Sequence, residues 1–323
     1  MSNFFAPVIG QTQAIALLTQ AVNRQRIAPA YLFVGSPGVG RSLTAQCFIM
    51  QIFCTDAPVG QHHQIKQRIQ LGNHPDVLWV QPTYLHQGQR LTAAEAAAAG
   101  VKRKAPPIIR VEQVREIAQF LSRSPLEASR NIVVIEQAET MAEAAANALL
   151  KTLEEPGLAT IILIAPAVEA LLPTLVSRCQ RIPFYRLSHE QMTQVLQQAS
   201  DENLQISPTV LAIAQGSPGD AIAASQQLQA IPAELIKALT HPPRSLHSAL
   251  DLARQIDKTL ETEAQLWLVD YLQHAYWQQF LAGDIQHSPL PYLEQAKKYL
   301  RSYAQPRLVW EVTFLQMSQL QPQ

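Results

Sequence analysis

Short apolar runs alternate with amphipathic stretches along the first part of the chain. Ala30–Val34, Val77–Val80, Ile132–Ile135 and 160–164 have strand length, and the last two are continuous and rich in β-branched residues, which is typical of strands buried on both faces. Residues 142–155 separate those two runs with a helical pattern that stops at a Pro-Gly pair. Strand, helix and strand in this order predict a parallel, doubly wound α/β sheet.

Three further segments carry apolar residues at helical spacing: 13–27, 42–53, and the stripe Val111, Val114, Ile117, Phe120 and Leu121, which Ser124-Pro125 ends. After Tyr185 the strand signals stop, and helical segments punctuated by proline follow, the first beginning at Ser188-His189-Glu190. The pattern therefore predicts an α/β domain over 1–185, a small helical domain over 186–231 and a helical bundle over 232–323.

Composition narrows the class of protein. The 323 residues contain 25 Lys and Arg against 25 Asp and Glu, and 47% are hydrophobic. This balance excludes a strongly basic coat for autonomous nucleic-acid binding and the profile of a disordered chain. No apolar stretch is long enough to span a bilayer, the N-terminus has no signal-peptide design, and three cysteines make no disulfide framework. We therefore expect a cytoplasmic protein with no membrane segment.

Two features could contact nucleic acid. The bundle contains a group of aromatic and apolar residues, Trp267, Leu268, Tyr271, Tyr276 and Trp277, which we expect to pack in a core, with base stacking as the alternative. The segment 82–107 contains the basic triplet Lys102-Arg103-Lys104, which could touch phosphates. We expect this segment to be a solvated surface insertion.

The sharpest local motif is Gly35-Ser36-Pro37-Gly38-Val39-Gly40-Arg41-Ser42. It follows a predicted strand and opens a predicted helix, as a phosphate-binding loop does. Glycines such as Gly35, Gly38 and Gly40 let backbone N–H groups approach phosphates, and Ser42 would supply the hydroxyl for magnesium. The motif requires lysine where this chain has Arg41, whose planar fork does not replace a compact ammonium. Nucleotide binding is therefore left open.

The acidic residues that should follow the second long apolar run are also altered. Competent ATPases of this layout place Asp and then Glu directly after the run, but this chain has Glu136 and Gln137. Glu136 is one methylene longer than the aspartate, and Gln137 cannot accept a proton from an attacking water. Glu139 could substitute as a base, but we expect it only to sit on a loop.

At this point the residues resemble a known family. The stretches FAPVIGQ (5–11), Ala30 to Ser42, GNHPD (72–76), AANALLKTLEEP (145–156) and Ser177-Arg178-Cys179 are similar to those of bacterial clamp-loader subunits of the AAA+ class. The resemblance covers about the first 185 residues. It implies an AAA+ domain with a parallel five-stranded sheet, then a small helical lid domain and a C-terminal helical collar that joins the subunits.

The family contains subunits that hydrolyse ATP and a partner that does not, and the departures separate them. By the resemblance, the sensor-1 position falls at Ala165-Pro166 and the sensor-2 position is Gly219, so neither supplies a polar side chain to a phosphate. Ser177-Arg178-Cys179, which serves a neighbour's nucleotide, is intact. The resemblance therefore implies a subunit without intrinsic ATPase activity, in which Arg178 is the catalytic residue as an arginine finger in trans.

The implied partners are the gamma or tau motor subunits and the delta subunit, with the sliding clamp and primer-template DNA reached through the complex. No cofactor is required, and weak binding of ATP or ADP at the altered loop stays open. Many relatives carry four cysteines after the phosphate-loop helix as a zinc site. Only Cys54 stands here, with His62 and His63 as the nearest possible ligands, so zinc is not expected.

Two alternatives compete with this interpretation. The chain could be an ATP-hydrolysing motor, or a metabolic P-loop kinase, although Arg41 and the long helical C-terminal part weigh against the kinase. Arg178 could instead be a buried structural arginine that ties a strand end to the next helix.

Overall fold

The structure is a computed structural model that describes residues 4–101, 106–154, 157–199, 208–243, 245–302 and 304–318. The basic triplet Lys102-Arg103-Lys104 therefore lies outside the described residues. Contacts divide the chain into two compact units, Met1–Val195 and Leu196–Gln323, and each is described by itself. The three-domain division at 185 and 231 stays a prediction.

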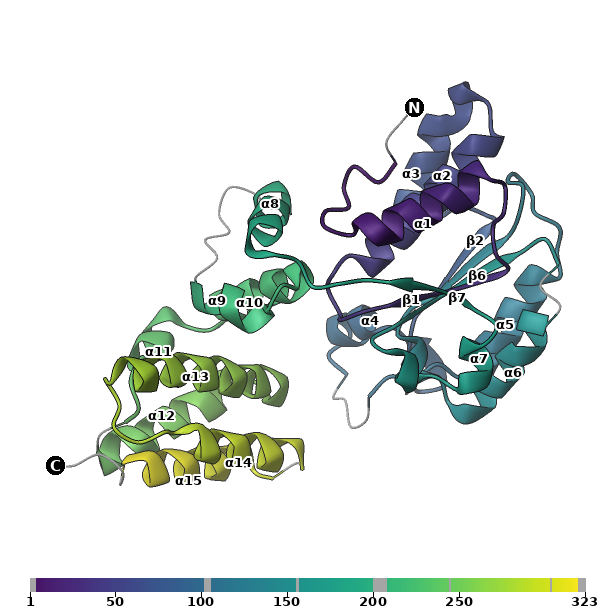
Figure 1. The fold of residues 1–323 in the computed structure, drawn as a ribbon. Coiled ribbons are helices and arrows are strands. Elements are labelled where there is room, and N and C mark those ends of the chain that lie inside the picture. The colour runs from purple at the N-terminus through teal and green to yellow at the C-terminus, as the bar shows by residue number, and fades with distance from the viewer. Residues whose placement is uncertain are drawn as a thin grey trace. The chain divides into compact units, whose positions relative to one another are not determined.

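The first unit contains a five-stranded parallel sheet with helices on both faces (Figure 1). Its order is β2 (Val77–Val80), β5 (Ile132–Ile135), β6 (Thr160–Ala165), β1 (Ala30–Val34) and β7 (Gln180–Pro183). In the register, Ile132 faces Thr160 and Ala30 faces Ile161. All residues of β5 and β6 are buried, because helices cover both faces of these central strands. The predicted parallel sheet and four of its strands are confirmed.

Helices form a layer on each face of this sheet. One layer holds α1 (Thr12–Asn23), α2 (Arg41–Asp56) and α3 (His62–Gln70), and the other holds α5 (Val111–Leu121), α6 (Glu143–Glu154) and α7 (Pro173–Val176) (Figure 1). Periodicity predicted α1, α2, α5 and α6. The edge strand β7 was not predicted, since its sequence Gln-Arg-Ile-Pro has one fully buried residue, Ile182.

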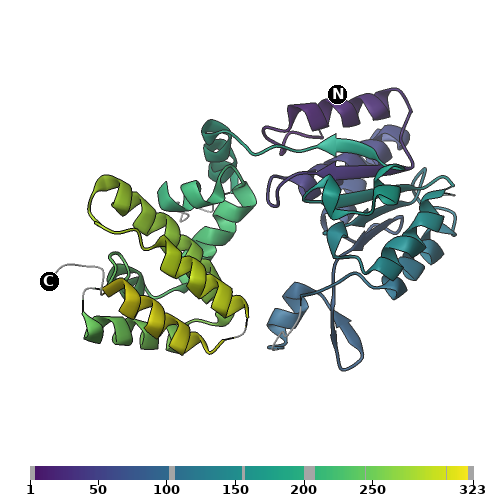
Figure 2. The ribbon, with the colours of Figure 1, turned by 60° about the horizontal axis from the view of Figure 1, so that its bottom comes forward.

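The described part of 82–107 is an excursion beyond the edge strand β2. It forms a hairpin of β3 (Tyr84–His86) and β4 (Gln89–Leu91), followed by the short helix α4 (Ala93–Ala98). The blue hairpin extends away from the sheet in Figure 2. A capping box between Thr92 and Glu95 starts α4. Most residues of the hairpin and α4 are exposed, which confirms the expected surface insertion.

All regular secondary structure among the described residues of the second unit is helical. The helix α8 (His189–Ala199) crosses the division between the units, and the rest are α9 (Pro208–Ala214), α10 (Pro218–Ala230), α11 (Ala233–Ala238), α12 (Leu246–Thr259), α13 (Thr262–Ala282), α14 (Leu290–Arg301) and α15 (Pro306–Ser318). No described helix is both long and apolar enough to cross a membrane.

The aromatic residues of the bundle are mostly core residues, as expected. Leu268 and Tyr276 are fully buried, and Trp267 and Tyr271 pack against the same core. The Tyr276 hydroxyl donates a hydrogen bond to the Leu239 carbonyl oxygen at 2.9 Å, which satisfies the one polar atom of this buried ring. Trp277 is the one of the five residues expected in the core whose side chain is exposed.

Candidate functional site

The phosphate-loop motif forms the tight turn that its glycines predict. Gly38 and Gly40 have φ angles of 71° and 96°, in the left-handed region that glycine adopts without steric cost, and Gly40 caps the start of α2. Only glycine fits at position 35 without a steric clash, because a Cβ atom there would lie 2.5 Å from the Phe184 carbonyl oxygen. Whether these glycines bind a phosphate stays a prediction.

Gln11 ties this loop to the chain that leaves β7. Its side chain is buried, and its Nε2 donates to the carbonyl oxygens of Val39 at 3.2 Å and Tyr185 at 2.7 Å. Its Oε1 accepts from the Tyr185 backbone N–H at 3.1 Å. Residue patterns did not single out this glutamine as a structural anchor, because its partners lie up to 174 positions away in the sequence. The loop is therefore fixed by the protein's own side chain.

The Arg41 side chain is partly buried. Its Nη1 atom is buried and has no hydrogen-bond partner. Burial lowers the pKa of the Arg41 guanidinium, and the carboxylates of Glu139 and Glu136 act in the opposite direction. Burial likewise raises the pKa of Glu139, against the effect of Arg41. The charge at the lysine position is thus influenced by carboxylates of the same chain.

The loop after β5 does not assemble an acidic pair for magnesium. Glu136 Oε2 accepts a hydrogen bond from Gln81 Nε2 at 2.9 Å. Gln137 has φ 47° and ψ 50°, a left-handed conformation that is uncommon for a residue with a side chain. Ser42 is partly buried in the first turn of α2. Within the described ranges, no group of three or more His, Cys, Asp or Glu could hold a metal ion.

The two sensor positions that the resemblance implies have no polar side chain. Ala165 is the fully buried end of β6, and Gly219 lies in the first turn of α10. The backbone loop suits a phosphate, but these side chains, together with Arg41 and Gln137, do not fit a magnesium nucleotide. We therefore derive no chemical step at this loop.

Arg178 lies in the turn between α7 and β7, and its guanidinium is accessible. The side chain is 38% exposed, so Arg178 is not fully buried, and its role as a catalytic or a structural arginine stays a prediction. Its Nη2 pairs with Glu154 Oε1 at 2.8 Å, and its Nη1 donates to the Thr174 carbonyl oxygen at 3.0 Å. The next residue, Cys179, is partly buried, and burial raises the pKa of its thiol to about 11. The turn is thus anchored by Cys179 and presents Arg178.

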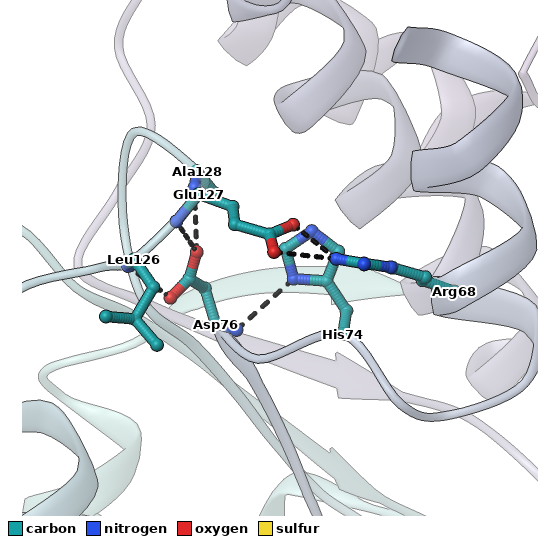
Figure 3. A network of polar contacts seen from close by, with 6 residues as sticks. All are labelled: Arg68, His74, Asp76, Leu126, Glu127 and Ala128. Atoms are coloured by element: carbon teal, nitrogen blue, oxygen red, sulfur yellow. Dashed lines mark hydrogen bonds and ion pairs between the residues drawn. The ribbon is translucent and has the colours of Figure 1, made fainter.

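The GNHPD motif has a structural role, as Figure 3 shows. The buried Asp76 carboxylate accepts hydrogen bonds from the backbone N–H groups of Leu126, Glu127 and Ala128 at 2.6, 2.8 and 2.7 Å. His74 Nδ1 accepts from the Asp76 N–H at 3.2 Å, and burial lowers the pKa of this imidazole. The motif therefore holds the loop between α5 and β5 and forms the predicted turn into β2.

The possible zinc ligands do not converge. Cys54 is buried near the end of α2, and burial raises the pKa of its thiol. A ring nitrogen of His62 lies 3.0 Å from the Ala57 carbonyl oxygen, and His63 is exposed. Among the described residues, these three side chains do not form a group that could hold a metal ion.

A parallel sheet of order β2-β5-β6-β1-β7, with a phosphate loop after β1 and a helical region that follows it in the sequence, defines the AAA+-like class. Residues 10–188 match the family described as DNA polymerase III, delta subunit, and residues 190–317 match the cyanobacterial DNA polymerase III delta prime C-terminal domain. The chain belongs to the DNA polymerase III delta prime family.

Curated relatives agree with this assignment. The chain is 31% identical over 180 residues to DNA polymerase III subunit delta' of Bacillus subtilis, an alignment that covers 55% of this chain and 48% of the relative. It is 33% identical over 211 residues to the same subunit of Pseudomonas aeruginosa, covering 63% and 57%. The chain thus spans about half the length of the curated relatives it matches.

A solved structure shows the same fold. A DNA polymerase III gamma subunit-related protein of Thermotoga maritima superposes with a TM-score of 0.55 at 16% identity, covering 95% of this chain and 99% of that one.

Proposed function

We propose that this chain is the non-hydrolysing delta prime subunit of the DNA polymerase III clamp loader. It acts with the gamma or tau motors and the delta subunit, which together place the sliding clamp on primed DNA. The family match and the delta prime names of its relatives support this proposal. The observation that carries it is the difference between two arginines: Arg41 is partly buried, with its Nη1 atom shielded from solvent, and Arg178 is exposed.

Arg178 has the properties of a residue that acts on a neighbouring subunit. A guanidinium is permanently charged and matches phosphate oxygens in a bidentate way. It has five N–H donors, and the bonds to Glu154 and Thr174 leave others for an acceptor outside the chain. In the proposed ring, Arg178 contacts the γ-phosphate held by the adjacent motor and stabilises the charge of its transition state.

The bundle over 232–323 would be the collar that joins the subunits. Its helices share one hydrophobic core, and large apolar side chains stay exposed on α12, α13, α14 and α15. On α12 and α15 these side chains are Leu246, Leu250, Leu308 and Val312. If these side chains form one continuous apolar patch in the assembly, that patch would be a contact surface for another subunit.

The proposal is tested by reconstituting the clamp loader with Arg178→Ala. We expect the ring to assemble, while ATP turnover stimulated by clamp and primed DNA falls, because an arginine finger is worth about 10³–10⁵ in turnover at the site it serves. The loss observed for the complex depends on how many sites need this residue. Arg178→Lys should rescue poorly, since a point charge does not reproduce the fork.

Arg181→Ala is the matched control. Arg181 is an exposed arginine three residues further along, in β7, and its loss should leave turnover unchanged. If Arg178→Ala matched the wild type in turnover while its melting temperature dropped, Arg178 would be a structural residue.

A further inference from the structure

The Arg178 side chain is held by anchors from two elements. Glu154, the last residue of α6, binds Nη2 at 2.8 Å through Oε1. Thr174 in α7 accepts from Nη1 at 3.0 Å through its backbone carbonyl. Because the two anchors bind different nitrogens, together they restrain both the position and the plane of the guanidinium.

Local stability does not account for a glutamate at position 154. The C-terminal end of a helix carries partial negative charge, so a carboxylate on its last residue is unfavourable there. The Glu154 side chain is 54% exposed, and exposed ion pairs add little to folding stability. Within the described residues, Glu154 makes a hydrogen bond and ion pair to Arg178 Nη2.

Ordering matters for a residue that must reach an acceptor on another molecule. A free arginine side chain has many rotamers, and fixing one of them has an entropic cost. A side chain that is already ordered in the free subunit loses less conformational entropy when it binds the acceptor. Catalytic groups are also sensitive to placement, since a misplacement of about 1 Å can reduce the rate about 10²-fold.

We propose that Glu154 is a positioning residue, which orders the Arg178 guanidinium for an anionic oxygen on the neighbouring subunit. The inference rests on the proposed trans-acting role of Arg178. Glu154 does not touch the nucleotide itself, and it keeps its bond to Nη2 while the other N–H groups of Arg178 bind the acceptor.

The test uses the reconstituted clamp loader with Glu154→Ala, Glu154→Gln, Arg178→Ala and the Glu154→Ala/Arg178→Ala double variant. The measurement is ATP turnover stimulated by clamp and primed DNA, as kcat and KM for ATP. We expect Glu154→Ala to lower kcat by a large part of the loss seen with Arg178→Ala, with KM and melting temperature unchanged. The kcat of the double variant should equal that of Arg178→Ala, because both substitutions remove the same interaction.

Glu154→Gln separates positioning from a structural role. Glutamine keeps an Oε1 acceptor at the same reach, so kcat should return to within about twofold of the wild type. Glu143→Ala is the control, since Glu143 is an exposed acid at the other end of α6, and its kcat should match the wild type.

The outcomes separate this inference from the proposed function. If Arg178→Ala lowers kcat and Glu154→Ala does not, Glu154 is not a positioning residue, and the role of Arg178 stands. If Glu154→Ala raises kcat, Glu154 restrains Arg178 instead of presenting it, and the inference is overturned. If Arg178→Ala itself has no effect, the proposed function fails first.

Discussion

Arg41 and Arg178 are the same residue type in the same unit, but the structure uses them in opposite ways. Arg41 has a buried Nη1 atom without a partner and lies in the field of the chain's own carboxylates. Arg178 is exposed, and both of its terminal nitrogens are held by hydrogen bonds. A charged group that the protein orders but leaves accessible is suited to a partner, whereas an inward one has become part of the fold.

The contacts that hold the backbone around the two arginines also differ. The phosphate loop is tied at Val39 by the buried Gln11, a side chain of the same unit. The Arg178 turn is tied through Cys179 and the end of α7, which leaves its guanidinium outside. The comparison predicts that changes near the loop act on stability and that changes at the turn act on the complex.

The largest stability effect is expected for Gln11→Ala. This change leaves two carbonyl oxygens and one N–H without the partners they have now, and each such group costs about 1–3 kcal/mol when it is shielded from water. We expect the free energy of unfolding in urea to fall by roughly 3 kcal/mol. Gln13→Ala, on the exposed side of α1, serves as the control and should change it little. A loss below about 1 kcal/mol for Gln11→Ala would show that the loop is held by other contacts.

A smaller effect is expected from the titration of His74. Burial lowers the pKa of His74 below its ordinary value of 6.5, against the carboxylates of Asp76 and Glu127, while Arg68 adds to the lowering. The folded state thus favours the neutral ring, so its contribution to stability is complete above pH 6.5 and is lost as pH falls below that value.

The measurement is urea unfolding of the wild type and His74→Asn over this pH range. Asparagine can still accept the Asp76 N–H but does not titrate, so the stability of His74→Asn should fall less steeply with acid. Arg178→Ala should retain the wild-type slope, because Arg178 is not among the groups that act on His74. Equal slopes for the wild type and His74→Asn would contradict the prediction.

The smallest effect is expected for the attempt to restore the phosphate loop. The isolated chain should show no magnesium-dependent ATP turnover above background, and Arg41→Lys with Gln137→Glu should not create it. Ala165 and Gly219 still lack polar side chains, and residue 137 keeps its left-handed backbone. A coupled assay of both proteins checks this. Turnover on the order of 1 per second would favour the ATP-hydrolysing alternative.

Some features could be predicted from the sequence because they depend on neighbouring residues. The runs at 132–135 and 160–164 are apolar enough to predict buried strands, and both form as β5 and β6. The glycines of the phosphate loop predict left-handed turns, which Gly38 and Gly40 adopt. Proline and helical spacing likewise predict an all-helical second part, which the described residues confirm.

Only the tertiary structure decided which groups the polar side chains bind. Arg178 meets Glu154 across 24 positions, Asp76 meets the loop at Leu126 across 50, and Gln11 meets Tyr185 across 174. β7 also depends on tertiary structure, because pairing with β1 defines it more than its own residues do. Local periodicity reports which residues leave water, since burial drives strand and helix formation along the chain. Hydrogen bonds between distant residues leave no periodic pattern, so the motif that singles out Arg178 does not reveal Glu154 as its partner until the chain has folded.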